Sequence, residues 1–189
     1  LGGYNDNYRL DRYDPEGDSW TNLTSSSRYR RTGIGGFIGG KFYVAGGSDG
    51  TLSWYDPATN TWTDGAYGPS DYWATGGIME GKLYFAGGNN TPSQLQVYDP
   101  GEDSWTVLTS MTYGREYASS AIIDGKLYVA GGLDSGTQLD VLEVYDPGTS
   151  TWTTLVSMPD TRYGAAGAAY QGKFYVIGGY TPTGYTDNA

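Results

Sequence analysis

The sequence contains neither cysteine nor histidine among its 189 residues. Without cysteine the chain can form no disulfide and has no thiol nucleophile, and without either residue type it lacks the usual ligands of zinc. Triads built on histidine are excluded for the same reason. Because catalysis would have to rely mainly on Asp, Glu, Tyr, Arg and Lys, we predict no metal site, no cofactor and no enzymatic activity.

Positive charge is also scarce, since 11 Lys and Arg stand against 21 Asp and Glu and give a net charge of -10. Nucleic-acid binding requires a basic surface that neutralises phosphates, so we predict that nucleic acid is not a partner. No run of about 18 apolar residues is present, so the sequence predicts no membrane insertion. No signal peptide is visible, and the start at Leu1 without a methionine is consistent with a processed, trimmed or partial product. The acidic composition, rich in Thr, Ser, Gly and Tyr, favours an extracellular or cell-surface location.

Glycine and aromatic residues are what the chain has in excess, with 31 Gly, 19 Tyr and 6 Trp. Such an aromatic sequence is not typical of a disordered segment, and the glycines lack the Gly-X-Y period of collagen. The composition therefore predicts an all-β protein.

Two sequence blocks recur four times in a fixed order, which indicates internal repeats. The first block reads GKFYVAGG at 40–47, GKLYFAGG at 81–88, GKLYVAGG at 125–132 and GKFYVIGG at 172–179. The second block is Tyr-Asp-Pro, then four residues, then Trp-Thr; its tryptophans are Trp20, Trp62, Trp105 and Trp152. Two blocks that alternate in this way indicate one structural unit used four times.

Each repeat divides into four short strands, a to d, joined by turns rich in Gly, Asp and Pro. Strand a is expected at 32–38, 73–79, 117–123 and 164–170, and strand b is the Lys-aromatic run that ends in Gly-Gly. Both faces of strand b are apolar, so neighbouring sheets must cover each face, as blades stacked around an axis would. The glycine pairs allow positive φ or close backbone approach; they are Gly46, Gly47, Gly87, Gly88, Gly131, Gly132, Gly178 and Gly179. The four tryptophans are expected to pack between blades.

A Gly-Gly pair after an apolar strand, followed by Tyr-Asp-Pro and a spaced Trp, resembles the kelch repeat of β-propellers. The resemblance covers essentially the whole chain and implies blades of four antiparallel strands, with strand a along the central axis and strand d outermost. Kelch-like propellers usually have six or seven blades, whereas this chain supplies the strands of four. We therefore predict a single kelch-type β-propeller domain over 1–189, with blades at about 30–68, 69–112 and 113–158 and a fourth divided between 1–25 and 160–189.

The divided blade allows two kinds of closure. The C-terminal strands a and b can pair with the N-terminal strands c and d of the same chain, which removes exposed sheet edges. Alternatively, the ends pair with neighbouring molecules or with a longer array, and such head-to-tail contacts can build a filament. The strand count favours closure within one chain, as do the small residues of strand a, such as Gly35, Gly36, Gly76 and Gly77.

Candidate binding residues lie eleven positions before each repeat lysine, at the start of strand a. They are Arg30, Asp71, Arg115 and Arg162, with Glu116 beside the third. At one mouth of the central channel they would bind a carboxylate or an acidic loop of a partner. The alternative, which the kelch resemblance favours, is that the arginines bond backbone carbonyls between blades. Two acceptor patterns for N-glycosylation also occur, at Asn22 and Asn89.

These features predict a non-catalytic extracellular or cell-surface module that binds protein or glycan. One alternative is a subunit that forms homo-oligomers, filaments or a surface layer by strand exchange at the divided blade. A second is a carbohydrate-active enzyme resembling the sialic acid mutarotases, for which Arg115 and Glu116 are the only adjacent pair of the required type. The sequence itself names neither ligand nor partner.

Overall fold

The computed structural model describes residues 8–28, 33–47, 49–182 and 184–185. All regular secondary structure in these ranges is β-strand, as predicted. Among the described residues no helix is long and apolar enough to cross a membrane.

Three antiparallel sheets of four strands form the body of the molecule. The first complete blade contains β3 (Ile34–Ile38), β4 (Lys41–Ala45), β5 (Thr51–Asp56) and β6 (Thr61–Tyr67). The second contains β7 (Thr75–Met79), β8 (Lys82–Ala86), β9 (Leu95–Asp99) and β10 (Ser104–Leu108). The third contains β11 (Ser119–Ile123), β12 (Lys126–Ala130), β15 (Leu142–Asp146) and β16 (Thr151–Thr154). Each blade is a meander of the predicted strands a, b, c and d, and the short hairpin of β13 (Leu133–Asp134) and β14 (Thr137–Gln138) lies within the third.

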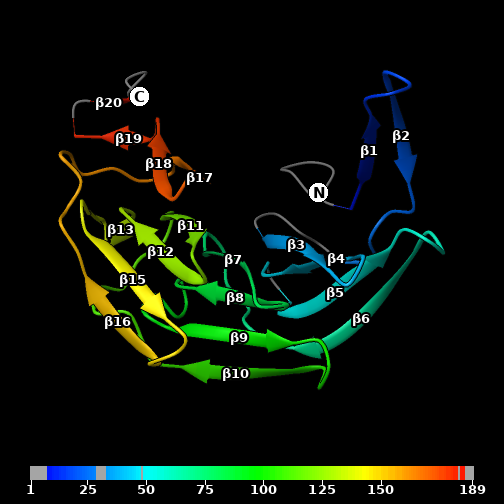
Figure 1. Ribbon diagram of the computed structural model, residues 1–189, viewed down its shortest axis with the longest axis horizontal. Helices are drawn as coiled ribbons and strands as arrows, with labels where there is room; N and C mark the ends of the chain where they lie inside the picture. Colours follow the sequence, from blue (N-terminus) through cyan, green and yellow to red (C-terminus); the bar gives the residue numbers. More distant parts are fainter. Residues whose placement is uncertain (1–7, 29–32, 48, 183, 186–189) are drawn as a thin grey trace.

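The remaining strands form hairpins near the two ends of the chain. The N-terminal hairpin consists of β1 (Leu10–Asp14) and β2 (Ser19–Leu23), which are strands c and d of the repeat. The C-terminal hairpin consists of β17 (Ala166–Tyr170) and β18 (Lys173–Ile177), which are strands a and b, and the short pair β19 (Tyr180–Thr181) and β20 (Gly184–Tyr185) follows it. These hairpins are separate two-stranded sheets, and they stand on opposite sides of the opening of a C-shaped arc (Figure 1). The closure within one chain that the strand count favoured is therefore not formed among the described strands.

The glycine pairs lie where one blade touches the start of the next. All eight have positive φ, for example 65° at Gly131 and 103° at Gly132. The amide of Gly132 donates to the carbonyl of Arg162, at 2.9 Å. A Cβ on Gly132 would lie 2.8 Å from the carbonyl oxygen of Glu116 in the same blade, so a larger residue there would force the end of β12 away from the segment before β11.

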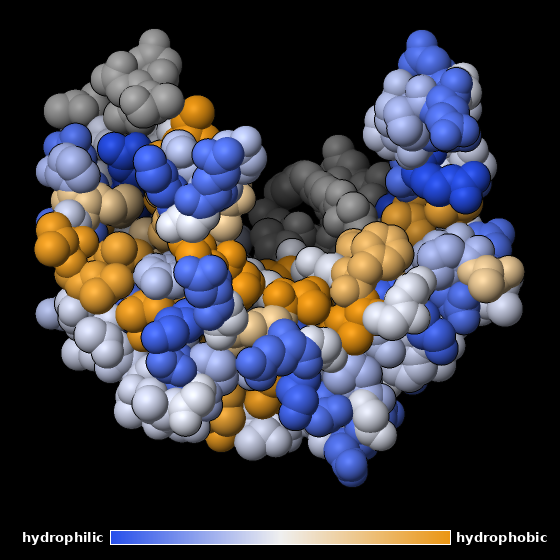
Figure 2. Space-filling model, in the orientation of Figure 1, coloured by the Kyte–Doolittle hydropathy of each residue, from blue (hydrophilic) through white to orange (hydrophobic). Residues whose placement is uncertain are grey.

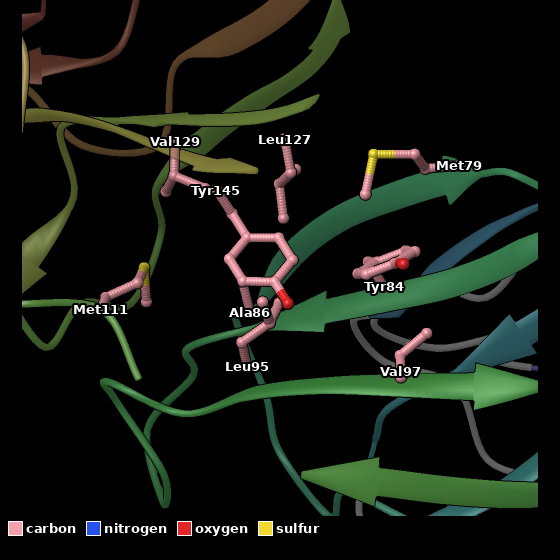
Figure 3. Packing of buried hydrophobic residues seen from close by; sticks show 9 residues of the cluster. All are labelled: Met79, Tyr84, Ala86, Leu95, Val97, Met111, Leu127, Val129 and Tyr145. Carbon is pink, nitrogen blue, oxygen red and sulfur yellow. The ribbon is translucent and has the colours of Figure 1, made fainter. Parts of the chain in front are cut away.

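Apolar side chains fill the spaces between blades. Between the second and third complete blades, Tyr84, Leu127 and Tyr145 are 5%, 0% and 1% exposed. Figure 3 shows the Tyr145 ring between Leu127 and the Ala86 and Leu95 side chains. This packing fixes the angle between neighbouring blades, because a close-packed interface does not deform continuously.

The repeat tryptophans do not share one environment. The Trp62 indole donates to the carbonyl of Thr24 at 2.7 Å, and the Trp152 indole donates to the carbonyl of Thr109 at 2.8 Å. Trp105 packs on the Phe85 and Tyr98 rings of its own blade. Trp20, by contrast, is 71% exposed. The prediction that Trp20 belongs to the core was wrong for this structure, because none of the other described residues covers its hairpin on the side of the opening (Figure 2).

Candidate functional site

The residues just before strand a meet the Gly-Gly ends of strand b on one face of the arc. Gly47 donates to the carbonyl of Asp71 at 2.9 Å, and Gly88 donates to that of Arg115 at 3.0 Å. The first strands of neighbouring blades contact one another, so these junctions lie along the inner side of the arc. Asp71, Arg115 and Arg162 thus occupy equivalent junctions, while Arg30 falls outside the described residues.

Arg115 is 1% exposed and forms bonds within its own blade. Its guanidinium donates to the carbonyls of Gly131 at 3.1 Å and Val141 at 3.0 Å, and it forms a buried ion pair with Glu143. The Glu143 carboxylate also accepts from the amide of Thr112 at 2.8 Å. Burial lowers the pKa of Arg115, and the charge of Glu143 acts in the opposite direction. This network joins strands b and c to the start of strand a.

Asp71 stabilises a loop of its own blade. It is 2% exposed, and its carboxylate accepts from the amide of Asn90 at 2.5 Å and from the hydroxyl of Thr91 at 2.7 Å. The aspartate that breaks the row of arginines therefore holds the loop between β8 and β9.

Arg162 and Glu116 differ from these two residues. Arg162 donates to the carbonyl of Gly178 at 3.4 Å, but its buried Nε has no hydrogen-bond partner among the described residues. Glu116 is half-buried, and burial raises the pKa of its carboxyl. The structure does not gather the predicted charged residues into one polar cluster, because Asp71 and Arg115 are each bonded within their own blade. Within the described part of the chain, no three Asp or Glu residues come together as a metal site would require.

A row of aromatic side chains, to which the repeat pattern did not point, runs along the same junctions. We call Trp73, Tyr117, Tyr163 and Tyr180 the aromatic row. The Trp73 and Tyr117 rings stack with centroids 4.6 Å apart. The Tyr117 and Tyr163 centroids are 5.9 Å apart, and those of Tyr163 and Tyr180 are 5.3 Å apart. All four side chains are half-buried, so the row presents part of its aromatic surface to solvent.

The backbone holds two members of this row in an uncommon conformation. Trp73 has φ 62° and Tyr117 has φ 56°, a region that costs bulky residues about 1–3 kcal/mol. The amide of Tyr117 donates to the carbonyl of Trp73 at 2.8 Å, and the amide of Gly164 donates to that of Tyr117 at 2.8 Å. In the C-terminal repeat the same position is Gly164, which also has positive φ. Bulky residues kept at positive φ at a position where glycine is equally compatible with the repeat are typical of positions that carry a function.

The two glycosylation candidates lie at different places in the blades. Asn22 is on β2 and is exposed, and its amide donates to the Asp11 carboxylate at 3.2 Å. Asn89 is exposed in the loop after β8, and its side-chain oxygen accepts from the amide of Tyr72 at 2.9 Å. Modification of either asparagine stays a prediction.

Comparison with known proteins matches residues 36–189 to a family described as the KLHDC2/KLHL20/DRC7 Kelch-repeats domain. The chain is 39% identical over 75 residues to the Kelch-like protein terF of Aspergillus terreus, covering 35% of this chain and 16% of that protein. It is 30% identical over 112 residues to a putative F-box/kelch-repeat protein of Arabidopsis thaliana, covering 56% of this chain and 32% of that protein. The chain thus spans a third or less of these curated relatives.

The solved structure of YjhT superposes on this chain with a TM-score of 0.68 at 16% identity. The superposition covers 89% of this chain and 83% of that one. At this identity the likeness concerns the fold, and it supports the predicted kelch-type propeller architecture.

Proposed function

The chain belongs to the kelch-repeat family, and from that premise we propose that it is a non-catalytic module that binds a partner protein through the aromatic row. Kelch domains generally mediate protein interactions, and the row is the feature of this chain best suited to such contacts. The observation that carries the proposal is the row of half-buried rings in mutual contact, in which Trp73 stacks on Tyr117 and Tyr117 contacts Tyr163 at the next junction in a tilted arrangement.

The physical chemistry of the row favours a protein or peptide surface. Tyr and Trp offer a large apolar face and a polar edge, and they are enriched at interfaces for that reason. Their rings already contact one another, so binding would immobilise few additional side-chain rotamers. The loops after strand b lie on the same face, and such variable loops on a rigid scaffold commonly supply specificity.

The charged residues of the mouth support a structural role instead of catalysis. The carbohydrate-active alternative depends on Arg115 and Glu116 acting together, but the Arg115 guanidinium is bonded to Glu143 and two carbonyls. A buried arginine with these partners is not free to hold a sugar carboxylate. Assaying the anomer exchange of N-acetylneuraminic acid by NMR, with and without the protein, tests this: catalysed exchange that Glu116→Gln abolishes would overturn the non-catalytic assignment.

The proposal also includes an extracellular or cell-surface location and glycan as a second class of ligand. The acidic composition, rich in Thr, Ser and Tyr, supports the location, and aromatic faces that stack on sugar rings support the ligand class. A glycan array probed with the wild type and with a Trp73→Ala/Tyr117→Ala variant separates glycan from protein binding.

A peptide-display experiment tests the proposed surface directly. Random peptides are selected on the wild-type protein, and their affinities are then measured for the wild type, for Trp73→Ala/Tyr117→Ala and for Tyr67→Ala. Tyr67 is the matched control, because it is a 72% exposed aromatic on the outer strand β6, away from the row. We expect a loss of at least about tenfold in affinity for the double variant, or about 1.4 kcal/mol, with no loss for Tyr67→Ala. Equal affinities for all three proteins would refute the proposed surface.

A further inference from the structure

A carboxylate without a counter-ion lies beside the aromatic row, and we propose that the row binds a basic segment of a partner protein, one Arg or Lys of which pairs with Glu116. This ligand class rests on the proposed function, because it names the charge of the peptide that the row would bind. The residues that carry it lie at the junction between the second and third complete blades.

Glu116 occupies a fixed place in the repeat. It lies ten residues before the repeat lysine, where the other repeats carry Arg31, Tyr72 and Tyr163. Its amide donates to the carbonyl of Leu133 at 3.0 Å, and its carbonyl accepts from the Leu133 amide at 2.8 Å. Tyr163 forms the same two bonds with Tyr180, at 3.2 and 2.9 Å. The backbone therefore holds Glu116 and Tyr163 in equivalent places at successive junctions.

This place is next to a ring of the preceding blade. The Tyr163 ring contacts the Tyr117 ring of the blade before it, with centroids 5.9 Å apart. Glu116 stands at the corresponding place one junction earlier, where the preceding blade supplies Trp73. The amide of Tyr117, the residue after Glu116, donates to the Trp73 carbonyl at 2.8 Å and keeps the two backbones in contact. The repeat geometry thus directs the Glu116 side chain toward the stacked rings of Trp73 and Tyr117.

The Glu116 carboxylate has no counter-ion in the described part of the chain. It takes part in none of the ion pairs there, and the preceding residue, Arg115, is paired with Glu143 instead. Burial raises the pKa of the Glu116 carboxyl, and no described cation acts against that shift. A half-buried charge without a partner lowers the stability of the free protein. Residues that reduce stability in this way are typical of binding sites.

The surroundings of the row are acidic. The segments that join strands at this end of the second and third complete blades are 66–74, 87–94, 109–118, 131–141 and 155–165. They contain no lysine, and their two arginines, Arg115 and Arg162, donate to carbonyls at the end of strand b in their own repeat. Their five carboxylates are Asp71, Glu116, Asp134, Asp140 and Asp160. The repeat lysines lie at the opposite end of strand b, so this face attracts a basic segment.

The sign of this face is the reverse of what the arginines before strand a predicted. They indicated binding of a carboxylate or an acidic loop, but Arg115 is 1% exposed and is paired with Glu143. The charged group left without a partner is the carboxylate of Glu116. Aromatic faces also attract cations, and the stem of an Arg or Lys packs along apolar surface. A ligand whose Arg or Lys stem lies on the row and whose charge reaches Glu116 satisfies both features.

Peptide selection on three baits tests the charge of the ligand. Random peptides are selected in parallel at pH 7 on the wild type, on Glu116→Gln and on Glu102→Gln. Glu102 is the matched control, because it is an exposed carboxylate in the turn between β9 and β10 and its change removes the same charge. We expect Arg and Lys to be enriched at least about threefold over the library on the wild type and on Glu102→Gln, but not on Glu116→Gln.

Neutral side chains in the selected peptide measure the pairing itself. In the tightest peptide each Arg is replaced in turn by citrulline and each Lys by norleucine, which removes the charge and keeps the length. At one position we expect the neutral peptide to bind the wild type at least about tenfold more weakly, whereas Glu116→Gln binds both peptides equally. Urea midpoints of the two proteins check the fold, and Glu116→Gln should not lower the midpoint because it removes an unpaired half-buried charge.

The outcomes separate the basic ligand from the proposed binding surface. A loss of affinity for Trp73→Ala/Tyr117→Ala, with unchanged affinity for Glu116→Gln, would keep the row as the surface and refute the pairing. Selected peptides without an excess of Arg and Lys, or a neutral peptide that binds as tightly as the charged one, would also refute it. Equal affinities for the wild type, the row variant and Glu116→Gln would refute the surface and the pairing together, as would a selection that yields no peptide.

Discussion

The buried ion pair of Arg115 and Glu143 gives the strongest stability prediction. Both side chains are 0% exposed, and the arginine also donates to two backbone carbonyls. Replacing Arg115 with Met leaves the Glu143 charge buried without its counter-ion, which costs about 3–5 kcal/mol. That loss is a large share of the roughly 5–15 kcal/mol that stabilises a typical domain. We therefore expect Arg115→Met to be among the most destabilising single changes in the chain.

Urea unfolding followed by tryptophan fluorescence measures this effect. For an m-value of about 2 kcal/mol/M, the midpoint should fall by on the order of 2 M. The matched control is Lys126→Met, which breaks the exposed ion pair with Asp146 in the same blade and should leave the midpoint nearly unchanged. In a double-mutant cycle with Glu143→Gln, the two losses should fall short of additivity. Similar midpoints for Arg115→Met and Lys126→Met would refute the structural role given to the buried pair.

Three further predictions concern packing, backbone and pH. Leu127→Ala should cost about 2–5 kcal/mol in the free energy of unfolding, because it opens a cavity between blades, and a loss below about 1 kcal/mol by urea unfolding would contradict the packing. Gly132→Ala should destabilise far more than Gly125→Ala, since a Cβ at Gly132 meets the Glu116 carbonyl at 2.8 Å and one at Gly125 meets nothing within 4 Å; equal midpoints would disprove it. Burial raises the pKa of Glu116 above its ordinary value of 4.5, so stability falls as pH rises from that value through the folded pKa. Glu116→Gln should therefore raise the urea midpoint at pH 7 relative to the wild type but not at pH 3.5, and a pH-independent difference would contradict this cause.

The repeat blocks predicted the strands because turn residues within each block mark where the strands begin and end. A Gly turn before the repeat lysine, Gly-Gly after strand b and Asp-Pro after strand c are local signals, and the structure has the expected strands between them. Strand a begins two residues later than predicted in the second and third complete blades. The reason is the positive φ at Trp73 and Tyr117, which keeps these residues out of the strand ladder.

The candidate site was less predictable, because its bonds join positions far apart in the chain. The partner of Arg115 is Glu143, and the equivalent strand-c positions carry Ser53 and Gln96, so no repeated residue type pointed to it. The aromatic row is not predicted by the repeat pattern, because its members do not occupy one repeat position: Trp73 and Tyr117 lie nine residues before the repeat lysine, and Tyr163 lies ten before it. The signal was present as aromatics two residues after Asp71 and Arg115, but their stacking across blades depends on the curvature of the arc.

The exposed Trp20 shows what a local pattern leaves undetermined. Its repeat block matches those of Trp62 and Trp152, yet it is 71% exposed. The burial of this tryptophan depends on the preceding blade, which supplies the carbonyls that accept from the Trp62 and Trp152 indoles.

Peptide binding to the aromatic row tests the central claim most directly. Peptides selected on the wild-type protein are titrated, by isothermal titration calorimetry, against the wild type and against the Trp73→Ala/Tyr117→Ala and Tyr67→Ala variants. The row predicts that the double variant binds at least about tenfold more weakly, or by about 1.4 kcal/mol, and that Tyr67→Ala binds as the wild type does. Equal affinities of the wild type and the double variant would contradict it.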